Sequence, residues 1–400
     1  MLAEGELKFP LGKVKQVAKK WLYLENDEII DVMVATHLAN QFDADPIWVL
    51  FIAPPSSTKT ELLRGFNGHP DIYSLSTLTP NTLISGMKKT GKENPSLIFK
   101  LTDKTIIIKE FTTILSMRSE SQQEVLSALR EVYDGYYSKS FGTGKHIDWE
   151  GKVGLMAACT PIYDKHYSVI GSMGDRFILY RSPKSNNRKM GFRAQKLVGR
   201  ENEMREEIRA AIHTFIDQFK DLSSQHFDAN TDEINEMIVA LACFCAIART
   251  PVDRDWKTQR VLYQPEPEGS GRLTKQFTQL GYSLALVHGK NNIDESVYKV
   301  LSKIGRDLIT RQRLKILQHM WNEKIADFAG HWKTTKEIAT PINMPTTTVK
   351  YALEDLMVIG AVNQDLESDG ETSPYIWQLS QEICELIGSS EVFEEPQNNG

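Results

Sequence analysis

The first half of the sequence predicts an α/β fold, and three patterns carry that prediction. Residues 47–53 and 105–111 are near-continuous apolar runs, which are typical of strands buried on both faces of a mostly parallel sheet. Stretches with apolar residues at helical spacing lie between such runs. After residue 181 the strand pattern stops and helical patterns follow. We therefore expect an α/β sandwich followed by helical parts.

Residues 1–199 are expected to form the α/β core, with a helical lead-in before the first strand. Its further strands are expected at three apolar runs, 71–75, 153–159 and 176–180. Helices are expected at 60–66 and 121–137, and the second of these has its apolar side chains on one face. The segment 181–193 reads as a polar loop.

Residues 200–310 are expected to form an all-α subdomain, or lid. An apolar face recurs along 204–219, and 233–249 are apolar on nearly every side, as in a buried helix. Another helix follows the breaker PEPEGSG and begins near Arg272.

Residues 311–384 have the element order of a winged-helix domain. Helices are expected at 311–323, 334–342 and 346–360, with a turn at 343–345, and a hairpin follows at 361–380. The acidic end, 385–400, is expected to be a disordered tail.

The composition limits which partners the protein can be expected to bind. The 47 basic and 52 acidic residues give a net charge of −5, so attraction to nucleic acid must come from a local patch. The four cysteines form no CxxC pair or secretory ladder, no signal segment is recognised, and no apolar stretch reaches the roughly 20 residues that span a bilayer. We expect a cytoplasmic protein with no membrane contact. No cluster shows metal-ligand spacing, so no structural zinc is predicted.

The segment APPSSTKT, residues 53–60, joins a predicted strand to a predicted helix and is the candidate phosphate loop. Backbone N–H groups would face the anion, Lys59 would add a cation, and the Thr60 hydroxyl would bind Mg²⁺ of a bound Mg²⁺–ATP. The context matches GxxxxGK[ST], but Ala53 and Thr58 replace the glycines. The candidate nucleotide-binding residues are Pro55, Ser56, Ser57, Thr58, Lys59, Thr60 and Glu61. The alternative is an ordinary strand–helix turn.

Three further residues follow in an order that suits phosphate chemistry. Glu110 ends the predicted strand 105–111, where a carboxylate would polarise the attacking water, although Lys109 precedes it. Thr160 ends the next strand, and Arg176 begins the last one, as a candidate arginine finger for a neighbouring subunit. Read alone, Glu110 is a strand-end surface carboxylate and Arg176 a salt-bridged arginine.

The order and spacing of APPSSTKT, IIIKEF, AACTP and GDRF, followed by GRLTKQFTQL and a winged helix, resembles an AAA+ ATPase. It is most similar to the motor of minichromosome maintenance (MCM) helicases and to superfamily III-like helicases of phages and mobile elements. The resemblance implies that Lys109-Glu110 takes the place of the DE pair, Thr160 of the sensor Asn, Arg176 of the arginine finger and Arg272 of the lid arginine. It implies a ring, most simply a hexamer, that moves DNA.

Residues 136–155 surround a Gly-Thr-Gly turn and are expected to form a β-hairpin. Lys145 and His146 lie at its tip, where MCM motors carry a hairpin that enters the central channel and superfamily III helicases carry a Lys-His pair. Such tips would follow a DNA backbone. The alternative is a solvated surface hairpin. A basic segment at 165–200 suits subunit contact as well as DNA contact.

The leading hypothesis is a ring-forming AAA+ ATPase that couples ATP binding and hydrolysis to DNA translocation or unwinding. One rival is a nucleotide-gated scaffold with little turnover. The other is a DNA-binding regulator of a mobile element, in which the winged helix is primary. The helix at 346–360 carries Glu354 and Asp355 and no basic stripe, which favours a docking role over sequence-specific DNA binding.

Overall fold

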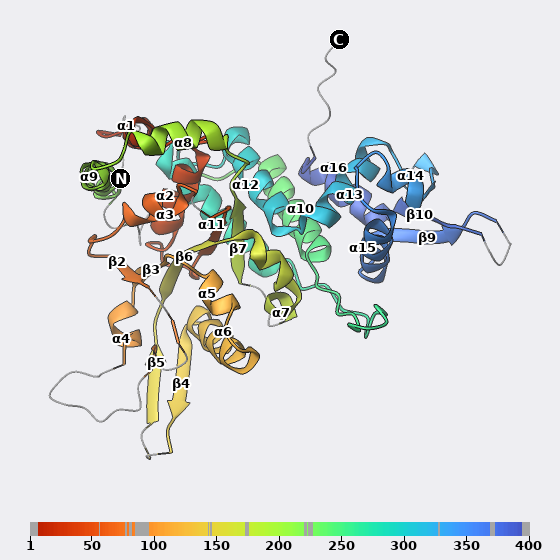
Figure 1. Cartoon of the computed structure of the whole chain (residues 1–400), viewed down its shortest axis with the longest axis horizontal. Coiled ribbons are helices and arrows are strands. Elements are labelled where there is room, and N and C mark those ends of the chain that lie inside the picture. The colour runs from red at the N-terminus through yellow and green to blue at the C-terminus, as the bar shows by residue number, and fades with distance from the viewer. Residues whose placement is uncertain are drawn as a thin grey trace, which may run out of the picture. The chain divides into compact units, whose positions relative to one another are not determined.

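The computed structural model describes residues 7–55, 57–76, 78–79, 82–84, 96–142, 144, 146–172, 176–219, 222, 227–326, 329–368 and 373–393. The chain forms two compact units (Figure 1). The first comprises residues 1–228 and 279–292, and the second comprises 229–278 and 293–400.

The first unit is built on a five-stranded parallel sheet in the order β2-β3-β6-β1-β7. Its strands are β1 (Trp48–Ile52), β2 (Ile72–Leu75), β3 (Lys104–Ile108), β6 (Val153–Cys159) and β7 (Phe177–Arg181). Each lies within or at the border of one of the five predicted apolar runs, so the α/β prediction is confirmed. Every residue of β1, β6 and β7 is buried, which is why these strands read as continuous apolar runs.

Helices cover this sheet and lead into it. They are α1 (Leu11–Trp21), α2 (Glu28–Ala39), α3 (Lys59–Arg64), α4 (Ile98–Leu101), α5 (Thr112–Leu115), α6 (Ser119–Tyr133), the 3₁₀ helix η1 (Pro161–Lys165), α7 (Tyr167–Ser172), α8 (Asn187–Gln195) and α9 (Glu201–Ile216). Helices α2 and α3 contact β6, and α9 packs against α1, α2 and α3. Tyr133 of α6 packs edge-on against Trp48 of β1, with ring centroids 5.2 Å apart.

The predicted hairpin is present and extends away from the sheet (Figure 1). It comprises β4 (Tyr136–Ser140) and β5 (His146–Glu150), which pair in antiparallel register with Ser140 opposite His146. Gly151 N donates to Gly135 O at 3.0 Å and closes the base. Trp149 Nε1 donates to Thr102 Oγ1 at 2.9 Å, just before β3. The hairpin base is therefore fixed to the segment that enters the sheet.

The second unit combines a helical group with a small sheet. Its elements are α10 (Asp232–Ala248), α12 (Glu295–Leu308), α13 (Arg311–Asn322), β8 (Lys333–Thr334), α14 (Thr335–Ala339), α15 (Thr346–Val358), β9 (Val362–Leu366), β10 (Tyr375–Leu379) and α16 (Gln381–Ser390). Helix α10 packs against α12 and α16. The small sheet has the order β8-β10-β9, and α13, α14, α15 and the β9–β10 hairpin follow the predicted order. Strand β8 was not predicted.

The contact units do not coincide with the domains expected from sequence. The region 200–310 is divided, since α9 packs in the first unit and α10 and α12 in the second, and α11 (Gly271–Val287) contains the boundary at 278/279.

Two local predictions were wrong. Residues 187–195 form α8 rather than loop, because the Asn186 side chain accepts a hydrogen bond from Lys189 N and caps it.

The second wrong prediction concerns the acidic tail. Residues 385–390 belong to α16, because Ile383, Cys384 and Ile387 recur at helical spacing and are buried. Residues 394–400 lie outside the described residues. No helix in the described ranges is both long and apolar enough to span a bilayer.

Candidate functional site

The connections that follow two neighbouring strands, β1 and β6, run in opposite directions across the sheet. The chain leaves β1 through α3 for β2 at one edge, whereas it leaves β6 through η1 and α7 for β7 on the other side of β1. In open α/β sheets a crevice forms outside the strand ends where connections diverge, and ligands bind there. The carboxyl ends of β1 and β6 therefore mark the candidate site.

The segment after β1 places a lysine ammonium within its own loop. Lys59 begins α3 and is only 3% exposed. Its Nζ donates to Ala53 O at 3.0 Å, to Pro54 O at 3.1 Å and to Ser57 Oγ at 3.3 Å. All three acceptors are neutral, so these hydrogen bonds hold the ammonium in place and leave its charge to attract an anion.

Electrostatics favour an anionic ligand here. Burial lowers the pKa of Lys59, and the negative charge of Glu110 opposes that shift. A phosphate beside the ammonium would oppose it further, because a nearby anion stabilises the charged form.

Thr58 stands in the place of the second motif glycine. Its φ of −68° and ψ of −10° are ordinary right-handed helical values, so this position does not need glycine's freedom. The missing glycine is therefore compatible with the loop conformation in this structure.

Glu110 follows β3 at the same edge of the sheet and is half-buried. Phe111 N donates to Ala158 O at 2.7 Å and holds this segment against β6. Glu110 Oε1 is buried and has no hydrogen-bond partner in the described part of the chain. A buried carboxylate oxygen without a donor is costly, which favours a water molecule or ligand group beside it.

Thr160 follows β6, and a side chain from the neighbouring segment holds it. Thr112 Oγ1 accepts a hydrogen bond from Thr160 N at 3.2 Å and lies 3.2 Å from Thr160 Oγ1. Ala53 N donates to Cys159 O at 3.2 Å, which ties the start of the loop to β6. Burial raises the pKa of Cys159 to about 11, and the charges of Glu110 and Lys59 both act on this thiol. The segments after β1, β3 and β6 therefore meet around Cys159.

A cavity of about 680 Å³ opens beside the loop. Three segments line it, namely 24–29, 53–59 and 182–194. Lys59 contributes to the lining together with apolar side chains such as Ile29 and Met190. A volume of roughly 300–1,000 Å³ with an apolar lining and a few polar groups is typical of small-molecule sites.

The other predicted loop residues divide between the cavity and the helix. Pro55, Ser57 and Thr58 line the cavity. Thr60 is the second residue of α3 and is half-buried. Ser56 lies outside the described residues.

Glu61 is engaged by the protein itself. It forms ion pairs with Arg64 and with Arg205 of α9, whose Nε lies 2.9 Å from Glu61 Oε2. Its carboxylate therefore helps to join α3 to α9.

Arg176 is not brought to the loop of its own chain. It precedes β7 at the amino edge of the sheet, whereas Lys59 lies at the carboxyl edge. Its Nε and Nη2 donate to Asp134 at 3.1 and 2.9 Å, and the guanidinium lies 5.7 Å from the centroid of Tyr133. This bidentate pair holds Arg176 against the end of α6.

Arg272 belongs to the second unit. It pairs there with Glu268, which also pairs with Arg249. The two arginines lower the pKa of Glu268 against the opposing effect of burial. Arg272 therefore takes part in an ion-pair group that joins residues within the second unit.

The hairpin presents His146 at the start of β5, where it is exposed. Its Nδ1 lies 2.8 Å from Ser140 Oγ and its Nε2 lies 3.0 Å from Asp148 Oδ1. Lys145 lies outside the described residues. Gly144 has a φ of +76°, which favours glycine in this turn.

Sequence reasoning missed two features of this edge. Thr112 holds Thr160, and a lone threonine carries no sequence signal for that role. Arg181 ends β7 opposite Ile52 and forms a buried bidentate pair with Asp164 of η1, at 2.7 and 3.1 Å. The position of Arg181 at the end of a predicted strand was the only sequence feature that could have indicated this role.

No protein-family model matches the chain, and no curated protein matches its sequence.

Proposed function

We propose that the first unit binds ATP at the carboxyl edge of its sheet. The observation that carries the proposal is the convergence of Lys59, Glu110 and Thr160, from three separate segments, where the connections of β1 and β6 diverge. The adjoining cavity supports it, since its size and apolar lining suit a nucleoside and Lys59 suits the phosphates.

The residues fit a triphosphate better than they fit its metal. Lys59 would hold the phosphates and Thr60 would hold Mg²⁺, which would neutralise part of their charge. Glu110 is the carboxylate at this edge for orienting a water molecule. Lys109 occupies the preceding position, and a lysine adds no oxygen ligand for Mg²⁺.

The larger assignment rests on the resemblance to AAA+ motors. On that reading, Thr160 senses the terminal phosphate, Arg176 acts on a neighbour's nucleotide and Arg272 reports to the lid. The hairpin tip with Lys145 and His146 contacts DNA in the centre of a hexameric ring. The exposed His146 and the extension of β4 and β5 from the sheet support the DNA role, and the order α13, α14, α15, β9, β10 supports a winged helix.

A second candidate is a nucleotide-gated DNA-binding scaffold or regulator with little turnover. Two observations favour it. Lys109 stands beside Glu110, and Arg176 is held by Asp134 of its own chain. To act as an arginine finger on a neighbouring subunit, Arg176 would have to give up its ion pair with Asp134 and contact a phosphate instead.

Titration calorimetry with Mg²⁺–ATP tests the binding step. Lys59 Nζ would exchange one of its three hydrogen bonds within the loop for a phosphate oxygen. Loss of that charged donor in Lys59→Ala is expected to weaken binding roughly 10- to 150-fold, because hydrogen bonds to charged groups contribute about 1.5–3 kcal/mol. Lys13→Ala, on the exposed face of α1, is the matched control and should bind like wild type. Absence of binding at millimolar ATP, or equal affinity in Lys59→Ala, would refute the proposal.

An experiment with mixed variant subunits distinguishes a motor from a scaffold. Lys59→Ala and Arg176→Ala subunits are each expected to lose DNA-stimulated phosphate release. If Arg176 acts in trans, a mixture of the two regains turnover above the sum of the separate rates, since some interfaces carry both intact residues. ATP binding without turnover in wild type would favour the scaffold.

A further inference from the structure

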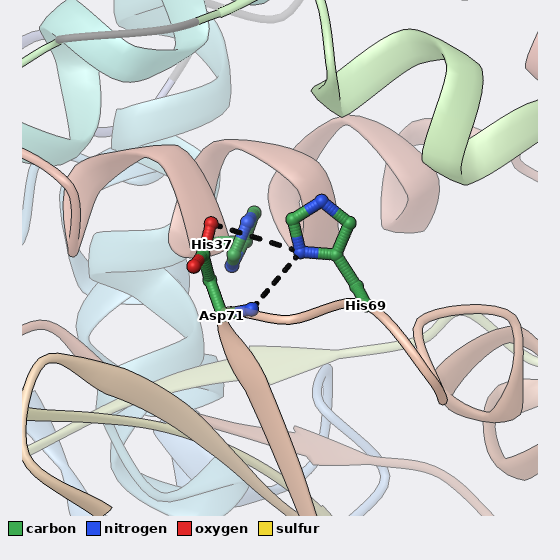
Figure 2. Close-up of side chains that lie close together, drawn as sticks. All are labelled: His37, His69 and Asp71. Carbon is green, nitrogen blue, oxygen red and sulfur yellow. Dashed lines mark hydrogen bonds and ion pairs between the residues drawn. The ribbon is translucent and has the colours of Figure 1, made fainter.

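A cluster of histidines and a carboxylate lies at the amino edge of the sheet. His37 comes from α2, His69 from the turn before β2, and Asp71 directly precedes β2 (Figure 2). One ligand atom of each residue lies within 4.8 Å of the other two. His37 and His69 are buried, whereas the Asp71 side chain is 49% exposed. The cluster is thus set into the protein with one side open to solvent.

One nitrogen of each imidazole is already hydrogen-bonded to a residue outside the cluster. His37 Nδ1 lies 3.2 Å from Thr105 Oγ1, and His69 Nε2 lies 3.3 Å from Asp217 Oδ1. Histidines that bind metals usually donate their second ring N–H to a carboxylate or another acceptor, which fixes the ring and raises its basicity. Thr105 and Asp217 are such acceptors, and they leave His37 Nε2 and His69 Nδ1 as ligand atoms.

His69 Nδ1 already faces Asp71. It lies 3.8 Å from Asp71 Oδ2 and accepts a hydrogen bond from Asp71 N at 3.3 Å (Figure 2). That backbone hydrogen bond indicates that Nδ1 is the unprotonated nitrogen, and a metal would take the place of the Asp71 N–H on its lone pair.

We propose that His37, His69 and Asp71 bind one divalent transition-metal ion of the Zn²⁺ class. Two imidazoles and a carboxylate form a set that borderline metals prefer, whereas Mg²⁺ and Ca²⁺ prefer oxygen ligands. Bonds of about 2.0–2.2 Å require the three groups to close in, and the exposed Asp71 side chain has room to turn. The fourth position is left to water or to His213, whose ring centroid lies 5.3 Å from that of His69.

The ion would join α2 to an edge strand. Strand β2 pairs only with β3 among the described strands, and the turn that contains His69 leads into it. A metal held by both elements would fix the start of β2, away from the carboxyl edge proposed for ATP. The inference therefore does not depend on the proposed function.

Calorimetry with ZnCl₂ on the full-length, chelator-treated protein is the test. We expect one equivalent to bind in wild type and to raise the thermal midpoint. Asp217→Asn, which weakens the acceptor beside His69 Nε2 and leaves the three proposed ligands in place, should weaken binding roughly 10- to 100-fold. Asp71→Asn and His69→Gln, which remove a ligand, should weaken it more. Asp71 and Asp217 are both substantially exposed, so their variants are expected to fold even if His69→Gln does not.

His331→Gln, at an exposed histidine of the second unit, is the control and should bind Zn²⁺ like wild type. All these variants keep the four cysteines. Zn²⁺ binding that survives unchanged in Asp71→Asn would therefore assign the ion to other groups and overturn the proposal. Absence of stoichiometric binding in wild type would overturn it as well.

Discussion

Replacing Gly154 by alanine should destabilise the sheet through one specific side chain. A Cβ at this position of β6 would lie 2.3 Å from Asn40 Cγ, 2.5 Å from Nδ2 and 2.7 Å from Oδ1. Asn40 cannot give way freely, since its Nδ2 donates to Thr36 O and Ile47 O and its Oδ1 accepts from Ile47 N, at 2.8–2.9 Å. These bonds fix the approach of the chain to β1.

The magnitude follows from those contacts. Displacing the Asn40 amide loses up to three buried hydrogen bonds of about 1 kcal/mol each, so the free energy of unfolding should fall by about 3 kcal/mol. That value lies at the upper end of the roughly 1–3 kcal/mol seen for overpacked cores. Asn40→Ala alone should cost about as much, because it removes the same bonds.

The double variant tests the cause. Once Asn40 is alanine, the new Cβ of Gly154→Ala meets no amide, and its added cost should be below about 1 kcal/mol. Urea unfolding followed by far-UV circular dichroism gives the four free energies, and hydrogen exchange of the 47–53 and 153–159 peptides localises the change. Gly12→Ala, where a new Cβ would meet nothing within 4 Å beyond its chain neighbours and its own helix backbone, is the control. Additive losses from Gly154→Ala and Asn40→Ala would refute the reasoning.

Three further outcomes are expected. Glu110→Gln removes a negative charge that acts on Lys59, so nucleotide should bind more tightly by calorimetry while any phosphate release is lost; weaker binding would contradict the proposed roles. The folded pKa of His37, about 3, lies below its unfolded value of about 6.5, so its contribution to stability is complete above pH 6.5. That contribution is lost as the pH falls toward 3, by about 1.4 kcal/mol per pH unit. Urea midpoints of His37→Gln and wild type, compared across this pH range, measure the loss. Burial raises the pKa of Cys159 to about 11, so this thiol should resist a disulfide reagent at pH 8 until the protein unfolds, as read by mass spectrometry of its peptide.

The strands could be predicted because their physical cause is local. A strand covered on both faces must be apolar at every position, and β1 and β6 meet that condition. The same pattern predicted a helix from residue 60 after β1, and α3 begins one residue earlier, at Lys59. The AAA+ assignment itself stays a prediction.

Pairings between distant residues could not be predicted. Asp134 and Arg176 are 42 positions apart, and nothing in either segment indicates the other. His37 lies 32 positions before His69, so no ligand spacing is visible along the chain. Helix α8 was missed for a different reason, because it has no buried residue and therefore no apolar period.

The anchoring of the hairpin has a mechanical consequence. Its base is held to Thr102, just before β3, and it runs directly into β6, while Asp103 N donates to Lys152 O at 2.7 Å between the two strands. Glu110 and Thr160 follow the far ends of those same strands. We therefore expect a force on the hairpin tip to act on both strands, which are about 15–25 Å long at roughly 3.3 Å per residue and lead to both polar groups.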